Sequence, residues 1–199
     1  FDTIIDFASG LPTQDHLHTV VKQGTTVIYS DYDPVVVEYA REILGDAPNV
    51  HFFEADARRP EELLNRPEVE RLLGGKRNVG LVYWGVTVFF SDDELQHAAR
   101  KLYEWAGDDA CWAFNAQGAG FSIDNPASAS ILQMYEGMGT PLRFRPQDNY
   151  VQLVKPWRST ESGYVSLLDW HGLNMSEMTD ADRLIFGSTG AGFGAYLIK

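Results

Sequence analysis

The stretch Ile4-Ile5-Asp6-Phe7-Ala8-Ser9-Gly10-Leu11-Pro12-Thr13, a few residues into the chain, decides the fold. It predicts a short apolar strand over residues 3–7, followed by a tight glycine turn and the start of a helix. This order is typical of the first corner of a nucleotide-type α/β sheet, where ligands meet the strand ends. Only Gly10 remains of the usual glycine cluster, so the corner needs support from the rest of the chain.

Alternating strands and helices continue through the first 117 residues of the chain. Apolar runs predict strands at residues 25–30, 50–54, 79–84 and 110–115. The helices between them have clear boundary signals, such as Asp33 as an N-cap before Pro34 and Gly45 at the helix end. Repeated strand–helix units predict an α/β fold with a Rossmann-like, doubly wound and mostly parallel sheet.

The pattern changes after residue 117, where the spacing is less regular. It predicts helices at residues 126–138, 148–154 and 179–186, and strands at residues 163–170 and 193–198. The composition shows no linker between the two parts. We therefore expect a single domain over residues 1–199, with a cofactor-binding half at 1–117 and an acceptor-side half at 118–199.

The charge and cysteine content exclude several classes of protein. A net charge of −12 without a basic run argues against nucleic acid as a partner, because phosphate binding needs basic patches. Cys111 is the single cysteine, so an internal disulfide is excluded and a reducing, cytoplasmic compartment is expected. The sequence contains no signal peptide and no long apolar span, so no contact with a membrane is expected. Self-association as a homo-oligomer stays open.

The expected ligand follows from the acid at the end of the second strand. Asp31 lies 21 residues after Gly10, where a carboxylate accepts hydrogen bonds from ribose hydroxyls of a dinucleotide or of S-adenosylmethionine. A dinucleotide needs several glycines and free backbone N–H groups around its pyrophosphate. Here Ala8 and Pro12 occupy such positions, and Pro12 has no N–H. These departures favour S-adenosylmethionine, which carries no phosphate.

Three strand ends together resemble a known class of enzyme. The order Asp6…Gly10, Asp31-Tyr32 and Asp56-Ala57 is similar to that of class I S-adenosylmethionine-dependent methyltransferases, whose last strand is antiparallel. The segments at residues 9–13, 31–36, 59–64, 67–69 and 89–93 resemble, more narrowly, a bacterial family named S-adenosyl methyltransferase and formerly listed as a domain of unknown function. The resemblance covers residues 1–117 well and the remainder in outline.

The resemblance implies roles for the residues of the first two strand ends. Asp6 and Gly10 would shape the turn around the methionine part of the cofactor. Ser9 and Thr13 would contact the methionine carboxylate. Asp31 would hold the ribose. The residue type also supports this role, because burying a carboxylate at the end of an apolar strand costs free energy unless the carboxylate has hydrogen-bond partners.

The next two strand ends would hold the base and the methyl group. By resemblance, Tyr32 would pack its ring against adenine, and Asp56 would accept from the adenine amino group. The Ala57 N–H would donate to the adenine ring. Trp84 and Gly85 would border the sulfonium and its methyl group. Taken without the other two strand ends, Asp56 would be better interpreted as a turn or capping residue.

Catalytic residues are harder to find than cofactor-binding ones. There is no Asn-Pro-Pro-Tyr motif after the fourth strand, so no amino-nitrogen acceptor is indicated. The candidates are His16 as an acid–base group, and Trp84 and Asn115 as residues that orient the acceptor. His16 and His18 are two residues apart in a helix, which makes a poor metal pair, and no metal is expected. The Arg58-Arg59 pair is predicted to be solvated surface.

Three functions are consistent with the sequence. The first is a methyltransferase that uses S-adenosylmethionine on a small-molecule acceptor. The second is a non-catalytic protein that binds S-adenosylmethionine, and the third is a nicotinamide-dependent reductase, which Pro12 disfavours. The acceptor, its reacting atom and a lid segment before Phe1 are left open.

Overall fold

The structure, a computed structural model, describes residues 1–12, 16–118, 126–180, 183 and 187–199. They form an eight-stranded sheet with the order β3-β2-β1-β4-β5-β8-β6, in which β7 also pairs with β8. The strands are β1 (Thr3–Phe7), β2 (Thr26–Asp31), β3 (Val50–Glu54), β4 (Gly80–Tyr83), β5 (Cys111–Gln117), β6 (Arg158–Ser159), β7 (Val165–Ser166) and β8 (Gly192–Ile198). β1 to β5 run parallel and β8 runs antiparallel to β5. The predicted doubly wound sheet with an antiparallel last strand is confirmed.

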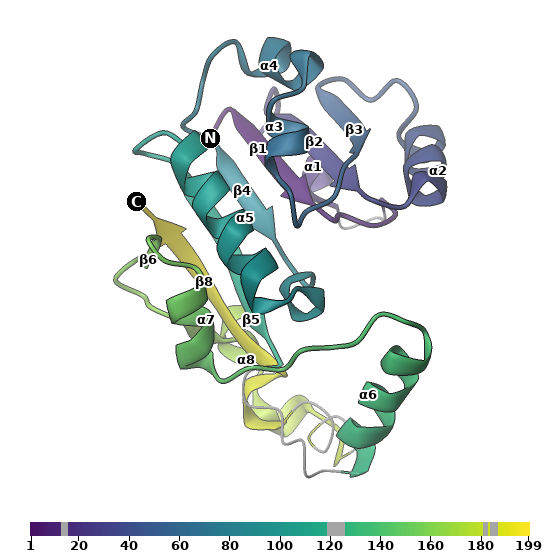
Figure 1. Ribbon diagram of the computed structural model, residues 1–199, viewed down its shortest axis with the longest axis vertical. Coiled ribbons are helices and arrows are strands. Elements are labelled where there is room, and N and C mark those ends of the chain that lie inside the picture. Colours follow the sequence, from purple (N-terminus) through teal and green to yellow (C-terminus); the bar gives the residue numbers. More distant parts are fainter. Residues whose placement is uncertain (13–15, 119–125, 181–182, 184–186) are drawn as a thin grey trace.

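Helices cover both faces of this sheet (Figure 1). They are α1 (Leu17–Val20), α2 (Pro34–Leu44), α3 (Glu61–Leu64), α4 (Pro67–Leu73), α5 (Asp92–Trp105), α6 (Pro126–Gly137), α7 (Gln147–Leu153) and α8 (Leu167–Trp170), with 3-10 turns η1 (Thr87–Phe89), η2 (Met175–Glu177) and η3 (Gly187–Thr189). The helices α3, α4, α5 and α7 share one buried cluster with the sheet, whereas α2 contributes to a second cluster. Helix α6 stands away from the sheet, below the strand ends in Figure 1.

The strand order places a crevice at the carboxyl ends of the strands. β1 has β2 on one side and β4 on the other, so the direction in which successive strands are added to the sheet reverses at β1. In doubly wound sheets, ligands bind outside the carboxyl ends of the strands at this point. The predicted corner after β1 lies there, as do the ends of β2 and β4.

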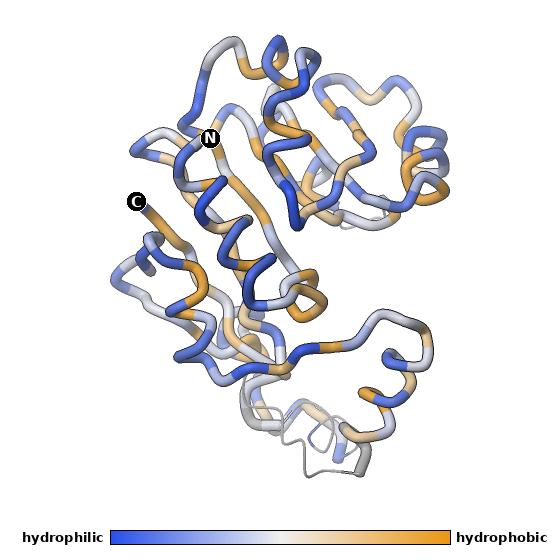
Figure 2. Tube along the Cα trace, in the orientation of Figure 1, coloured by the Kyte–Doolittle hydropathy of each residue, from blue (hydrophilic) through white to orange (hydrophobic). Residues whose placement is uncertain are grey.

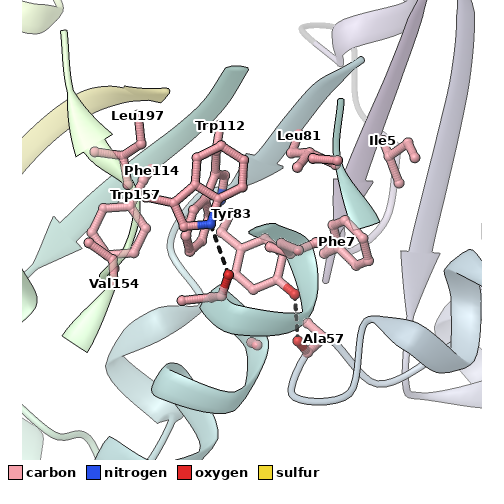
Figure 3. Close-up of a cluster of buried hydrophobic side chains, with 14 of the residues drawn as sticks. Ile5, Phe7, Ala57, Leu81, Tyr83, Trp112, Phe114, Val154, Trp157 and Leu197 are labelled. Carbon is pink, nitrogen blue, oxygen red and sulfur yellow. Dashed lines mark hydrogen bonds between the residues drawn. The ribbon is translucent and has the colours of Figure 1, made fainter. Parts of the chain in front are cut away.

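Aromatic side chains dominate the larger core, which Figure 3 shows in close-up. Trp112 is fully buried, with its ring centroid 5.2 Å from that of Tyr83 and 5.5 Å from that of Trp157. The Trp157 Nε1–H donates to the Ala99 carbonyl over 2.8 Å, and the Tyr83 hydroxyl donates to the Ala57 carbonyl over 2.6 Å. The second of these bonds ties the end of β4 to the loop after β3, so the core reaches directly to the strand ends.

Hydropathy along the chain follows this layering (Figure 2). Helix α5 alternates hydrophobic and hydrophilic bands, and its buried residues are Leu95, Ala98, Ala99 and Leu102. A capping box starts this helix: the Ser91 hydroxyl accepts from the Glu94 N–H, and the Glu94 carboxylate accepts from the Ser91 N–H. Within the described residues, no helix combines the length and the apolar character that crossing a membrane requires.

The predicted elements agree with the structure closely in the first half. The bounds of β1 and β3 are as predicted, and Asp33 caps α2 by accepting from the Val35 N–H over 2.8 Å. The strand predicted at residues 163–170 is wrong, because only β7 is extended and α8 follows it. The Ser166 side chain caps α8 by accepting from the Asp169 N–H, which turns an alternating pattern into a helix start. The helix predicted at 179–186 falls largely outside the described residues.

Candidate functional site

A cavity of about 650 Å³ lies at the carboxyl ends of the parallel strands. Six residues predicted to bind a cofactor line it: Asp31, Tyr32, Asp56, Ala57, Trp84 and Gly85. They come from the ends of β2, β3 and β4, and Ala8 adds the end of β1. The topology therefore brings the ends of β1 and β4, with Ala8 and Gly85 77 residues apart in sequence, around one space.

The first corner is held by its own backbone and by β2. The Ser9 N–H donates to the Ser30 carbonyl over 2.8 Å, and the Ser9 hydroxyl donates to the Asp6 carbonyl over 2.8 Å. Gly10 has φ 65°, a left-handed conformation that favours glycine, and Ala8 adopts φ 54° without being glycine. Thr13, predicted to contact the methionine carboxylate, lies outside the described residues.

Asp31 joins the first corner to the start of α2. One carboxylate oxygen accepts from the Gly10 N–H over 3.1 Å, and the other accepts from the Asp33 N–H over 3.0 Å. The residue is 8 % exposed and lines the cavity. A carboxylate has about four lone-pair sites, so about two remain for a ligand. The two backbone N–H groups therefore offset part of the free-energy cost of burying this acid, and the unused acceptor sites are open to a ligand that binds in the cavity.

Asp6, the acid that ends the apolar run of β1, lies in register with Tyr29 and Val82. Burial raises the pKa of its carboxyl from 3.8 to about 7, although the neighbouring Ser9 side chain acts to lower it. Asp6 is not among the residues that line the cavity. The Asp6 carboxyl instead contacts the Ser9 side chain of the first corner.

The raised pKa of Asp6 makes stability depend on pH in a defined direction. Between pH 3.8 and about 7 the native chain binds more protons at this carboxyl than the unfolded chain, so its contribution to stability falls as pH rises. Asp6→Asn, which mimics the protonated acid, should therefore be more stable than the parent chain, and by a larger margin at pH 8 than at pH 5. Thermal unfolding at both pH values checks this, with the exposed Asp2→Asn as control. A gain that is equal at the two pH values would contradict it.

The cavity wall after β3 contains an ion pair that was not predicted from the sequence. The Arg58 side chain folds back on Asp56, with Nη2 2.6 Å from Oδ2 and Nε 2.9 Å from Oδ1. Burial raises the pKa of Asp56, but the bonds from Arg58 outweigh it and lower that pKa overall. Arg58, predicted to be solvated surface, has a side chain that is 42% exposed and also pairs with Asp56, whereas Arg59 is exposed and pairs with Glu62 at 3.2 Å.

Gly85 turns the chain away from the end of β4. It has φ 77°, and its N–H donates to the Asn115 side-chain oxygen over 2.8 Å. Asn115 is 3 % exposed and its carbonyl accepts from the Thr87 hydroxyl over 3.0 Å. The structure thus places Asn115 behind the cavity wall, where it holds the turn that carries Gly85. The side-chain oxygen of Gln117 is buried in the same place without a partner among the described residues.

Trp84 connects the cavity to an aromatic group on the far side of β4. Its ring centroid lies 5.2 Å from that of Trp170, and Trp170 lies 4.9 Å from Tyr196 on β8. The His171 ring is edge-on to Trp84 at 6.5 Å. The Trp84 indole is therefore held by packing and has no need of the ligand to fix its orientation.

His16 lies away from the cavity lining, beside Tyr29. Its ring centroid is 5.2 Å from that of Tyr29, and His18 Nδ1 lies 3.0 Å from the Tyr29 hydroxyl. Both histidines therefore contact one tyrosine. Burial, and then the neighbouring His18, lower the pKa of His16. Over the part of the chain that the structure describes, three or more metal-ligating side chains gather nowhere.

The outer wall of the cavity comes from residues far along the chain. Phe89 of η1 faces Tyr135 of α6 with ring centroids 5.9 Å apart, and the loop that carries Gly139, Thr140 and Arg143 completes this wall. The Arg143 N–H donates to the Val88 carbonyl over 2.7 Å. Nothing in the sequence indicated residues 135–143 as part of this wall.

Arg145 anchors this loop to α5. It is 7 % exposed, and its Nε donates to the Asp92 carboxylate over 2.7 Å. Its Nη2 donates to the Phe90 carbonyl over 2.5 Å and its Nη1 to the Arg143 carbonyl over 3.2 Å. The loop, η1 and the start of α5 thus meet at one guanidinium.

The groups around the cavity fit S-adenosylmethionine better than a dinucleotide. Asp31 offers acceptor sites to ribose hydroxyls, and the Ala57 segment, at the end of the adjacent strand β3, lines the same cavity and is available to the base. Pro12, after the corner, has no N–H to offer a phosphate. At Asp56, the Arg58 guanidinium already occupies part of the carboxylate, which leaves that carboxylate fewer free acceptor sites than Asp31 has.

Comparisons with known proteins give the same class. The model of a family described as S-adenosyl methyltransferase matches residues 1–192. Two solved structures are similar to this chain over its whole length, each at 23% sequence identity. One is a putative methyltransferase from Thermobifida fusca, with 73% of its own chain covered and a TM-score of 0.80. The other is a DUF574 family protein from Streptomyces avermitilis, with 76% of its own chain covered and a TM-score of 0.81. Fibrillarin of Aeropyrum pernix with bound S-adenosyl-L-methionine matches at 13% identity over 99% of this chain and 66% of its own, with TM-score 0.54. No curated protein matches the chain.

Proposed function

The chain belongs to the S-adenosyl methyltransferase family, and from this premise we propose that the strand-end cavity binds S-adenosylmethionine and presents its methyl group to a small-molecule acceptor. Asp31 holds the ribose at one wall of the cavity, and Tyr32, Asp56 and Ala57 surround the base. Trp84 and Gly85 border the methyl group at the end of β4. The first corner, with Asp6, Ser9 and Gly10, supports the methionine part.

One observation carries the proposal: the unfilled capacity of the Asp31 carboxylate. Its two oxygens accept one backbone N–H each, from Gly10 and Asp33, which fixes its orientation. About two lone-pair sites remain, and a ribose offers two adjacent hydroxyls. A buried acid with unused acceptor sites is costly unless a ligand uses them. A diol at the cavity wall supplies the missing donors.

The chain's contribution to the reaction is alignment and shielding. When bound, S-adenosylmethionine supplies a sulfonium methyl group for SN2 displacement. Trp84 and the Gly85 turn fix the wall past which the acceptor approaches, and Asn115 holds that turn through the Gly85 N–H. Phe89, Tyr135 and the loop to Arg143 cover the cavity and keep water out. A dedicated base is needed only for an acceptor that loses its proton early.

The acceptor class follows from the surface and from the aromatic walls. Phe89, Tyr135 and Trp84 suit a flat or apolar molecule, and a net charge of −12 favours a neutral or cationic one. The same charge disfavours nucleic acid. We also propose a cytoplasmic location, because the single Cys111 is typical of a reducing compartment.

Calorimetric titration separates the proposed function from its alternatives. We expect S-adenosylhomocysteine to bind with one site per chain and NADH to show no binding. NADH binding without S-adenosylhomocysteine binding would contradict the proposal. Incubation of S-adenosylmethionine with a panel of neutral and cationic aromatic acceptors should then yield S-adenosylhomocysteine. Binding without turnover on any acceptor would favour a non-catalytic binding protein.

A further inference from the structure

The Asp56 carboxylate is surrounded by donors from a single residue. Oδ1 accepts from the Arg58 backbone N–H at 2.9 Å and from Arg58 Nε at 2.9 Å. Oδ2 accepts from Arg58 Nε at 3.0 Å and from Nη2 at 2.6 Å. The Asp56 side chain is 16% exposed, so water reaches it poorly. Four donor contacts meet one carboxylate.

These contacts occupy most of the carboxylate. They come from three N–H groups of Arg58, because Nε carries a single hydrogen that the two oxygens share. An ionised carboxyl offers about four lone-pair sites, so about one is left for an adenine amino group at this wall. Asp31, on the same cavity, has about two sites left because only two N–H groups contact it. If the Arg58 guanidinium leaves, further acceptor sites on Asp56 become available to adenine.

Glu94 is placed to receive the displaced guanidinium. Its Oε1 lies 3.6 Å from Arg58 Nη1, within ion-pair range but beyond hydrogen-bond range. Its Oε2 accepts from the Ser91 N–H over 2.7 Å in the capping box of α5, so the carboxylate is held in place. The cavity lining includes Asp56, Arg58 and Glu94 together. Arg58 therefore lies within ion-pair distance of two acids, Asp56 and Glu94.

We propose that Arg58 moves from Asp56 to Glu94 when the adenine ring enters, and that Glu94 is a positioning residue for cofactor binding. The proposal rests on the proposed function, in which Asp56 reads the base. In the free protein Arg58 neutralises Asp56 and competes with the ligand. In the complex Glu94 holds Arg58, while Asp56 keeps the Arg58 backbone N–H and accepts from the adenine amino group.

A double-mutant cycle on S-adenosylhomocysteine affinity tests the exchange. Arg58→Met removes the competitor and should tighten binding about threefold to tenfold. Glu94→Gln preserves the capping box but removes the charge that receives Arg58, and should weaken binding by a similar factor. The double variant should bind like Arg58→Met, because Glu94 has no role once Arg58 is gone. Arg59→Met and Asp93→Asn are controls of matched charge and should leave affinity unchanged.

A second ligand distinguishes exchange from a general effect on the fold. The analogue with purine in place of adenine lacks the amino group, so Arg58→Met should not tighten its binding. Additive effects in the cycle, weaker binding in Arg58→Met, or equal effects on both ligands would overturn the exchange. Asp56→Asn tests the proposed function separately: it should lose the preference for adenine over purine. If that preference persists, the assigned role of Asp56 fails, whatever the cycle shows.

Discussion

Asp31→Ala should lower the affinity for S-adenosylhomocysteine by about 100-fold or more while the fold stays intact. Hydrogen bonds to a charged group contribute about 1.5–3 kcal/mol each, and the ribose is proposed to make two of them. A loss of about 3 kcal/mol corresponds to roughly two powers of ten in the dissociation constant. The variant also frees the Gly10 and Asp33 N–H groups, which loosens the first corner. Asp31→Asn keeps one acceptor oxygen and should lose less.

The neighbouring acid provides a matched control. Asp33 caps α2 by accepting from the Val35 N–H. Asp33→Ala should cost about 1 kcal/mol of folding stability and leave the ligand affinity unchanged. Calorimetric titration of both variants, with circular dichroism to check the fold, compares the two roles. An Asp31→Ala variant that binds as tightly as the parent chain would refute the ribose contact.

Trp112→Ala should produce the largest loss of stability, about 4 kcal/mol in the free energy of unfolding. Its ring is fully buried among Tyr83, Phe114 and Trp157, with centroids 5.2, 5.1 and 5.5 Å away (Figure 3). Removing it leaves a cavity lined by rings that cannot collapse without moving β4 and β5. Because Tyr83 also anchors the loop at Ala57, we expect weaker cofactor binding in the same variant.

A less buried tryptophan sets the scale for this loss. Trp105 ends α5 at the edge of the same core, where the Arg77 guanidinium lies 4.7 Å from its ring centroid. Trp105→Ala should cost about 1–2 kcal/mol, since it loses a partly exposed ring and one cation–π contact. Urea unfolding followed by circular dichroism gives both values. Equal losses in the two variants would contradict the central place of Trp112, and Trp112→Phe serves if the alanine variant does not fold.

The fold is predictable from the sequence because its signals are local. Parallel strands covered on both faces are short apolar runs, and their ends are marked by acids such as Asp6, Asp31 and Asp56. The order of these ends along the chain then defines the crevice. The strand at 163–170 fails for a local reason too: Ser166 can start a helix as readily as it can continue a strand.

The electrostatics of the site are not predictable in this way. Arg58 follows Asp56 by two residues, and its spacing fits solvation as well as a fold-back onto the acid. The guanidinium also lies 3.6 Å from Glu94, which comes from α5 and is 36 residues further along the chain. The outer wall at Tyr135 and Arg143 is likewise brought in by tertiary packing, through Arg145 and Asp92. Propensity and periodicity carry no information about such partners.

Ala8 gives the first corner an unusual balance of energies. A non-glycine residue at φ 54° carries a conformational penalty of about 1 kcal/mol, which glycine would avoid. Glycine would in turn cost about the same amount by enlarging the freedom of the unfolded chain. The two effects nearly cancel, so stability hardly distinguishes alanine from glycine here. What differs is the methyl group that alanine adds to the cavity wall. Alanine in place of glycine at this corner therefore changes the shape of the cavity while leaving the free energy of unfolding almost unchanged.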